Sequence, residues 1–401
     1  MLTRYLRAAP YDGPMSRTPE AHAAAIAEAL GERRTEPTSP LNAAARNAVL
    51  ASAVVAPRQQ PPFTNSQMDG YAVGEVGARE AVVGPTVAAG ADPDAAYPVG
   101  LGALAAPVMT GAKLPRGTRA VVPVEACDPG EFVGEGERVR LPATEEGAFV
   151  RRAGSDIAAG EELAPAGAPV TPALVGALAS QGIGEVEVVR AARIVIVTGG
   201  AEVTASPAGP ATIPDANGPM LRALAARYGI GVAAHVRTSD DPDELEAQVR
   251  EAIAEHAPDA VVTSGGISHG KFEVVRQVFR QGWYGHVAQQ PGGPQGLSRF
   301  AETPVISLPG NPISTLVSFR TYVAPLLGHA PEPILAPLAC DVAGLEGREQ
   351  FLRGAVKHGA LRPIGGPGSH LLAQGAQATH LIRIPAGATL RAGELAAAYP
   401  L

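Results

Sequence analysis

Two glycine-containing loops in the second half of the chain have the composition of anion-binding loops. The apolar run AVVTS continues into SGGISHGK, Ser264 to Lys271, ahead of a predicted helix. The backbone N–H groups of such a loop converge with the start of the helix and stabilise a phosphate or another anion. Taken alone, the loop fits a glycine-rich connection without a ligand equally well. The P-loop pattern GxxxxGK[ST] fails at Phe272, where a hydroxyl must hold Mg²⁺, so a P-loop nucleotidase is disfavoured.

The second loop is LPGNP, Leu308 to Pro312, which ends one predicted strand and begins one predicted helix. Asn311 is expected to cap that helix, and Pro312 to be its first residue. Loops that end neighbouring strands of one parallel sheet face one pocket. By itself, LPGNP is explained more simply as a turn between a strand and a helix that binds no ligand.

Several carboxylate and hydroxyl residues lie at predicted turns. Asp240 and Asp241 stand between a strand and a helix, so one is expected to cap the helix while the other reaches a metal or a ribose. Asp69 precedes Gly70 in PPFTNSQMDGYAV, where a turn is the simpler interpretation. The alternative is a carboxylate that projects into another domain's cleft, and Thr110 in VMTGAKLP has the same two interpretations. No HExxH string occurs, so a zinc hydrolase is disfavoured.

A regular alternation of strands and helices from Arg193 onward must position both loops. Such alternation is typical of a doubly wound parallel sheet with right-handed crossovers. Ligands of these sheets bind at the carboxyl ends of the strands, where both loops lie. The predicted strands are RIVIVT, IGVAAHV, AVVTS and PVISL, and the predicted helices are 217–228, 241–256, 273–280 and 312–327.

The remaining segments have other patterns. Ala-rich stretches predict short helices over 19–30 and 41–51, and a third helix is predicted over 172–182. Over 61–142, short Val-rich runs between Gly and Pro predict a small β domain. A Pro-rich hinge over 331–337 leads to β-like runs that are typical of a small β-barrel.

Composition restricts the class of protein. A chain of 401 residues exceeds the roughly 250 to 300 residues over which one core grows, so several domains are expected. The net charge of −7 argues against a nucleic-acid partner, and no run of about 18 apolar residues predicts a membrane span. Cys127 and Cys340 are interpreted as small buried hydrophobes in a reducing cytoplasm. Residues 1–14, ahead of Met15, are interpreted as a dispensable extension.

Seven strings follow one another in a specific order from Pro61 to the C-terminus. They are PPFTNSQMDGYAV, VMTGAKLPRGTRAVVPVE, VRRAGSDIAAGEEL, VTGGAEV, SGGISHG, QQPGGPQG and LPGNPIS. In this order and spacing they resemble the molybdopterin molybdenumtransferase family, MoeA, which includes the E domain of gephyrin. Any one string alone is unspecific, whereas seven in one order are not coincidence.

The resemblance implies a multidomain fold and a homodimer. The implied parts are a linker and dimerisation domain over 15–60 and 148–190, a β-rich domain over 61–147, a doubly wound α/β molybdopterin-binding domain over 191–328 and a C-terminal β-barrel domain over 329–401. The β-rich domain of one subunit would complete the cleft of the other. Nothing in the resemblance implies nucleic acid or a membrane.

The resemblance also implies the reaction and its site residues. Molybdate would be inserted into adenylated molybdopterin with Mg²⁺ as cofactor and with release of AMP, the final step of molybdenum cofactor biosynthesis. Mg²⁺ would neutralise the pyrophosphate and make AMP a better leaving group. The implied catalytic residues are Asp69, Thr110, Glu202, Asp240 and Glu273, and of these Asp69, Asp240 and Glu273 are the implied Mg²⁺ ligands. The implied substrate-binding residues are Gly265, Gly266, Ser268, Asn311, Ser314, Pro294, Arg299, Arg353 and Ser369.

Two departures from the family pattern concern acidic residues. The usual TGDE reads TGGAE here, one residue longer, which leaves the register of Glu202 open. Glu273 replaces the usual Asp and keeps the charge on a longer arm.

A third departure removes charge from the anion pocket. Where the family commonly reads KPGKP, QPGGP puts Gln290 and Gly293 in place of two lysines. An oxyanion prefers positive charge, and the candidates to supply it are Arg299, Arg353 and His286. The loss favours an alternative function, that of a degenerate paralogue which carries molybdopterin nucleotide without metal insertion. The retained carboxylates favour the enzyme, and a tungsten-inserting homologue is a further alternative.

Overall fold

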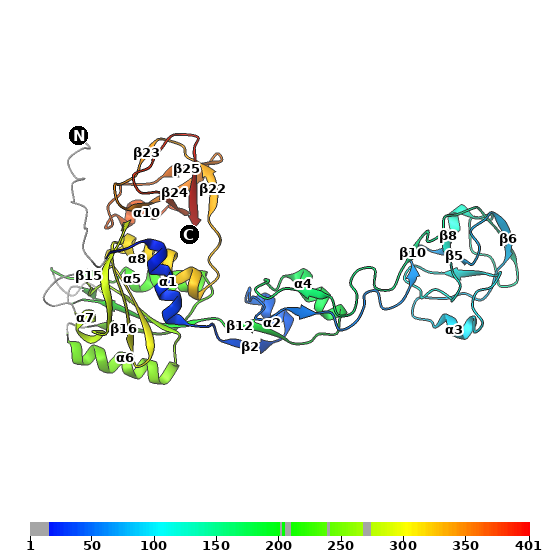
Figure 1. The fold of residues 1–401 in the computed structure, drawn as a ribbon, viewed down its shortest axis with the longest axis horizontal. Helices are drawn as coiled ribbons and strands as arrows, with labels where there is room; N and C mark the ends of the chain where they lie inside the picture. Colours follow the sequence, from blue (N-terminus) through cyan, green and yellow to red (C-terminus); the bar gives the residue numbers. More distant parts are fainter. Residues whose placement is uncertain (1–15, 201–202, 205–209, 239–240, 268–273) are drawn as a thin grey trace. The chain divides into compact units, whose positions relative to one another are not determined.

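The structure is a computed structural model that describes residues 16–200, 203–204, 210–238, 241–267 and 274–401 (Figure 1). The chain divides into two compact units. The first unit contains the chain up to Thr35 and from Val189 to the C-terminus, and the second contains Glu36 to Val188. Within the described residues, no helix is long and apolar enough to cross a membrane.

The first unit is built on a seven-stranded sheet with the order β1-β18-β20-β21-β17-β13-β16. Strands β21, β17, β13 and β16 run parallel, as the alternation of strands and helices predicts. Strand β20 runs antiparallel to both of its neighbours. The strand bounds are β1 (Ser16–Arg17), β13 (Arg193–Gly199), β16 (Gly231–Thr238), β17 (Ala260–Ser264), β18 (Gly282–Val287), β20 (Pro294–Phe300) and β21 (Thr303–Leu308).

The antiparallel pair β18 and β20 is an addition to the doubly wound parallel sheet that the sequence predicts. Neither strand is predicted from the sequence, because glycines and a proline interrupt both apolar runs. The glycines let the two strands pack closely. A Cβ on Gly296 would lie 2.4 Å from Cε1 of Tyr284, so a side chain at this position would collide with the ring.

Helices cover both faces of the parallel strands. Ile194 and Ile196 of β13 pack on one face with residues of α5 and η2, while Val195 and Val197 pack on the other face with residues of α6 and α7. Burial on both faces explains why RIVIV is a continuous apolar run instead of an alternating one. The helix bounds are α1 (Pro19–Leu30), α5 (Asn217–Arg227), α6 (Pro242–His256), α7 (Val274–Val278), α8 (Pro312–Ser318), η2 (Phe319–Val323) and α9 (Ala324–Leu327).

Polar caps fix where these helices begin. The Asp241 carboxylate accepts hydrogen bonds from the backbone N–H groups of Asp243 (2.9 Å) and Glu244 (3.3 Å) at the start of α6. The expectation that one of the two neighbouring aspartates caps this helix is therefore confirmed. The helix predicted over 312–327 is a continuous helical segment in which a π-helical turn, η2, separates α8 from α9.

The C-terminal part of the first unit is a β sheet with the order β19-β24-β26-β28-β22, in which β25 also pairs with β24. Strand β22 lies inside the segment predicted as a Pro-rich hinge, so that segment is only partly a connection. The bounds are β19 (Gln289–Gln290), β22 (Ile334–Pro337), β23 (Val342–Ala343), β24 (Glu349–Lys357), β25 (Ala360–Pro363), α10 (Leu372–Gly375), β26 (His380–Ile384), β27 (Thr389–Leu390) and β28 (Leu395–Pro400). Two further short strands, β14 (Val203–Thr204) and β15 (Ile213–Pro214), form a separate parallel pair.

The second unit contains a β-rich part and a part with two short helices. The three-stranded sheet β7-β5-β8 and the pair β6-β9 enclose a core that includes Tyr71 and Val122. The helix predicted over 41–51 ends at Ala45, because Asn47 has a φ of 51° that no α-helix continues. The bounds are β2 (Thr35–Thr38), α2 (Pro40–Ala45), β3 (Val54–Val55), β4 (Asn65–Ser66), β5 (Gly70–Val73), β6 (Arg79–Val82), α3 (Pro93–Ala96), β7 (Ala105–Val108), β8 (Ala120–Pro123), η1 (Val124–Ala126), β9 (Arg138–Leu141), β10 (Val150–Arg151), β11 (Glu162–Ala164), α4 (Pro172–Ser180) and β12 (Val186–Val189).

A buried arginine ties the end of the chain to the α/β sheet. Arg320 in η2 is 2 % exposed and lies between the rings of Tyr228 and Tyr399. Its guanidinium donates to the carbonyl of Pro400 (2.7 Å) and to the carbonyl of Pro331 (2.6 Å). Burial lowers the pKa of Arg320 from its ordinary value. Removal of this side chain would leave the carbonyl of Pro331 without this donor, and the carbonyl of Pro400 with the Tyr228 hydroxyl at 3.4 Å.

We expect Arg320→Met to lower the free energy of unfolding of the first unit by about 1 to 3 kcal/mol, the cost of leaving one buried acceptor, the carbonyl of Pro331, without its donor. The chain has one tryptophan, Trp283 in β18, so tryptophan fluorescence during urea unfolding reports on this unit. Arg250→Met is the control, because Arg250 also lies over an aromatic ring but is 57 % exposed, and its loss should cost less than about 1 kcal/mol. Equal losses in the two variants would contradict the structural role of Arg320.

Candidate functional site

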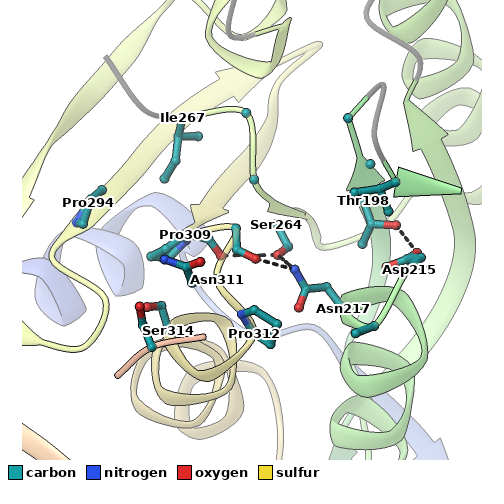
Figure 2. A pocket seen from close by; sticks show the side chains of 18 of the residues that line it. Thr198, Asp215, Asn217, Ser264, Ile267, Pro294, Pro309, Asn311, Pro312 and Ser314 are labelled. Atoms are coloured by element: carbon teal, nitrogen blue, oxygen red, sulfur yellow. Dashed lines mark hydrogen bonds between the residues drawn. The ribbon is translucent and has the colours of Figure 1, made fainter. Parts of the chain in front are cut away.

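A cleft of about 810 Å³ opens at the carboxyl ends of β13, β17 and β21 (Figure 2). Both glycine-containing loops line it. The described lining residues are Thr198, Gly199, Gly200, Val203, Ile213, Pro214, Asp215, Ala216, Asn217, Ser264, Gly265, Gly266, Ile267, Val274, Gln290, Gly292, Gly293, Pro294, Pro309, Gly310, Asn311, Pro312, Ser314 and Ser369. The cleft thus combines the α/β sheet with Ser369 from the C-terminal part of the same unit.

The first loop depends on glycine at two positions. Gly265 and Gly266 have φ values of 94° and 69°, which favour glycine over other residues. A Cβ on Gly266 would lie 2.6 Å from Cγ2 of Val275, so the loop also packs closely on α7. Ser268, the remaining predicted binding residue of this loop, lies outside the described residues.

The second loop meets the first, glycine against glycine. A Cβ on Gly310 would lie 3.2 Å from the Cα of Gly265. Asn311 and Pro312 occupy the cap and first helical positions of α8 as expected, but the Asn311 side chain makes no capping hydrogen bond. Ser314, which is 4 % exposed, lies one turn further on and also lines the cleft.

A polar cluster that sequence reasoning missed lies at the far side of the cleft. The Thr198 hydroxyl donates to Oδ2 of Asp215 at 2.8 Å (Figure 2). It also lies 2.7 Å from Nε2 of His235, and the Gly218 N–H donates to Oδ1 of Asp215 (2.8 Å). The Asp215 side chain is 4 % exposed. Burial lowers the pKa of His235, against the raising effect of the Asp215 carboxylate. The available signal was PDANG, in which Asp215 stands three residues before a glycine at the start of a helix.

The cleft carries little charge for a site that would bind anions. Among its described lining residues, Asp215 is the one with a charged side chain. Gln290 and Gly293 do line the cleft, at the place where the family pattern has lysines. His286 lies beside them, because a Cβ on Gly293 would be 2.9 Å from Nδ1 of that histidine.

Two predicted cations do not reach the cleft. Arg299 lies in a separate hollow, where it donates to the carbonyls of Glu302 (2.9 Å) and Ala29 (2.6 Å). Arg353 is 3 % exposed and donates to the carbonyl of Leu371 at 2.7 Å and to the carbonyl of Gly366. Both guanidinium groups therefore stabilise backbone in this structure, and the expectation that they line the anion pocket is corrected.

Asp69 and Thr110 lie together in the β-rich part of the second unit. Oδ1 of Asp69 accepts hydrogen bonds from the backbone N–H (2.6 Å) and from the hydroxyl (2.8 Å) of Thr110. The bond from the backbone N–H, followed by that from the hydroxyl, lowers the pKa of Asp69. Asp69 precedes β5, and a Cβ on Gly70 would lie 2.1 Å from the carbonyl oxygen of Val122, so only glycine follows it here.

The remaining predicted acidic residues, Glu202, Asp240 and Glu273, lie outside the described residues. Within the described residues, no group of three or more His, Cys, Asp and Glu side chains is arranged to hold a metal ion. The interpretation of both cysteines as buried is half right, since Cys127 is buried and Cys340 is exposed. Burial raises the pKa of the Cys127 thiol to about 11.

The sequence matches family models along most of its length. Residues 17–182 match the MoeA N-terminal region (domain I and II), residues 194–329 a probable molybdopterin binding domain, and residues 335–401 the MoeA C-terminal region (domain IV). Molybdopterin molybdenumtransferase 2 of Mycobacterium tuberculosis is 36 % identical over 400 residues, which cover 92 % of this chain and 95 % of the relative. The molybdopterin molybdenumtransferase of Staphylococcus aureus is 27 % identical and covers 77 % of this chain and 76 % of its own.

Solved structures agree with these matches. A molybdopterin biosynthesis MoeA protein from Pyrococcus horikoshii superposes with a TM-score of 0.79 at 26 % identity, over 96 % of this chain and 99 % of that one. A second MoeA structure from this source gives a TM-score of 0.77 at 22 % identity. The fold expected from the resemblance, an α/β molybdopterin-binding domain with a β-rich domain and a C-terminal β domain, is thereby confirmed. This chain belongs to the MoeA family of molybdopterin molybdenumtransferases.

Proposed function

We propose that this protein inserts molybdate into the dithiolene of adenylated molybdopterin and releases AMP, with Mg²⁺ as cofactor. The observation that carries the proposal is the strand-end cleft, in which two glycine-containing loops meet inside the molybdopterin-binding match of residues 194–329. Its volume of about 810 Å³ suits a ligand larger than a single phosphate.

The cleft offers neutral donors for an oxyanion. The side chains of Gln290, Asn311, Ser314 and Ser369 line it, and no hydrogen bond ties any of the four to the described residues. Amide and hydroxyl groups donate to oxyanions without charge of their own. We assign them to the molybdate and the pyrophosphate oxygens of the substrate.

Asp69 has the properties of a ligand for a hard cation. Its carboxylate is ionised and exposed, and the two hydrogen bonds from Thr110 occupy Oδ1 and orient the group. Oδ2 makes no hydrogen bond to the described residues, and carboxylate oxygens suit Mg²⁺. When bound, Mg²⁺ would neutralise charge on the pyrophosphate. The family resemblance gives Asp240 and Glu273 the same role.

The decisive experiment combines adenylated molybdopterin with molybdate and measures active cofactor by reconstitution of an apo-molybdoenzyme. Formation of cofactor with stoichiometric AMP supports the proposal. Binding of the nucleotide without insertion would instead support the carrier function, for which the neutral Gln290 and Gly293 are the motivating observation. Tungstate in place of molybdate tests the tungsten alternative in the same assay.

The exposed Asp69 carboxylate leads to the first prediction for this reaction. We expect Asp69→Asn to reduce AMP release on the order of 100-fold, because the amide removes a charge that holds Mg²⁺. Pterin-nucleotide binding and thermal unfolding should not change. Asp92→Asn is the control, since Asp92 is an exposed aspartate of the same unit. Near wild-type release in Asp69→Asn would disprove the assigned role.

The neutral anion pocket leads to the second prediction for this reaction. Gln290→Lys should lower the molybdate concentration for half-maximal insertion by about 10-fold, because charge-assisted hydrogen bonds are about twice as strong as neutral ones. Gly293→Lys is less suitable, although its φ is not positive, because its Cβ would lie 2.9 Å from His286. Gln377→Lys adds the same charge at an exposed position of the same unit. An unchanged half-maximal concentration in Gln290→Lys would mean that other groups already satisfy the anion.

We further propose that the protein is a homodimer, because the carboxylate assigned to Mg²⁺ lies in the unit that, by the family resemblance, completes a partner's cleft. Sedimentation velocity at micromolar concentration should show a species of twice the mass of the 40.8 kDa chain. An active monomer under these conditions would overturn the dimer.

A further inference from the structure

Three successive carbonyls of the LPGNP loop are held by donors beneath it. The Asn217 Nδ2 group donates to the carbonyl of Gly310 (2.7 Å) and the Thr315 hydroxyl donates to the carbonyl of Pro309 (2.6 Å). The carbonyl of Asn311 accepts the backbone N–H of Thr315 at 2.9 Å. Ser264 joins the two side chains. Its hydroxyl accepts from Asn217 at 2.9 Å (Figure 2) and lies 2.9 Å from the Thr315 hydroxyl.

The direction of each carbonyl fixes the direction of the next N–H. The cis peptide bonds of the described residues do not include those of this loop, so its peptides are trans and each N–H points opposite to its C=O. The N–H groups of Gly310 and Asn311 therefore point away from Asn217, Ser264 and Thr315. Neither N–H donates to another described backbone or side-chain group.

These two N–H groups matter because the cleft lacks cations among its described lining residues. Both Gly310 and Asn311 are exposed and line the cleft. Fixed backbone donors bind an oxyanion without reorganisation, provided that the peptide planes cannot turn over. If the Gly310 carbonyl turned toward the ligand, it would present a negative dipole to the same anion.

We propose that Asn217 is a positioning residue that aims the Asn311 N–H at a substrate oxyanion by holding the Gly310 carbonyl in place. Thr315 does the same for the Gly310 N–H through the carbonyl of Pro309. The inference deepens the proposed function and rests on it for the identity of the natural ligand, a pyrophosphate-bearing nucleotide. The side chain of Asn217 itself contacts protein, and its effect on the ligand is exerted through the loop.

Calorimetric titration with inorganic pyrophosphate tests this role without the pterin. Wild-type protein should bind pyrophosphate in the cleft. Asn217→Ala should weaken that binding by about 10-fold, the effect of losing one well-oriented hydrogen bond to a charged ligand. Thr315→Val should weaken it similarly, while Thr315→Ser, which keeps the hydroxyl, should bind as the wild type does. Asn42→Ala, at an exposed position of the second unit, is the control for asparagine loss.

The outcomes separate this inference from the proposed function. Unchanged pyrophosphate affinity in Asn217→Ala, or no pyrophosphate binding by the wild type, would overturn the positioning role. Equal weakening in Thr315→Val and Thr315→Ser would also overturn it, because a role through the hydroxyl predicts rescue by serine. Protein that binds pyrophosphate through Asn217 yet inserts no molybdate would leave this inference intact and would remove the proposed function.

Discussion

Burial of both faces of three neighbouring strands is the constraint on which the cleft depends. Helices pack on each side of β13, β17 and β21, and these strands are parallel neighbours, so all three end at one edge of the sheet. Their following loops must then meet. They meet closely, since a Cβ on Gly310 would lie 3.2 Å from the Cα of Gly265, which is tighter than an ordinary contact. The glycines of both loops are thus consequences of the sheet's packing as well as parts of the site.

The parallel strands and both loops could be predicted from the sequence because their signals are local. A continuous apolar run marks a strand that is buried on both faces, and glycine or Asn-Pro marks where it ends. Strands β18 and β20 lack such a signal, since close glycine packing holds them together. The string PDANG is a local signal for Asp215 alone, whereas nothing local joins Thr198 to His235, which contact each other across 37 residues. Only the folded sheet brings such residues together.

The positions of Arg299 and Arg353 show why charge is difficult to place from a string of residues. An arginine on a strand that lines a cleft can point to either face or along the edge, and carbonyls elsewhere compete for its planar group of donors. Both arginines contact such carbonyls. Arg353 cannot move to a ligand without leaving two partly buried carbonyls without its donors, which costs about 1 to 3 kcal/mol for each.

The described lining residues of the cleft include no cation, so the directions of its neutral donors matter more for anion binding than they would in a charged cleft. Lysine attracts an anion from several directions, whereas a peptide N–H or an amide attracts it along one axis. Asp215 adds to this demand, since an unscreened carboxylate would repel the substrate. It is held by Thr198 and the Gly218 N–H, and His235 and Arg237 lie 3.8 Å and 3.9 Å from its Oδ2. These contacts direct its charge toward the protein. The buried network under LPGNP therefore performs, by fixed orientation, part of what lysines perform by charge.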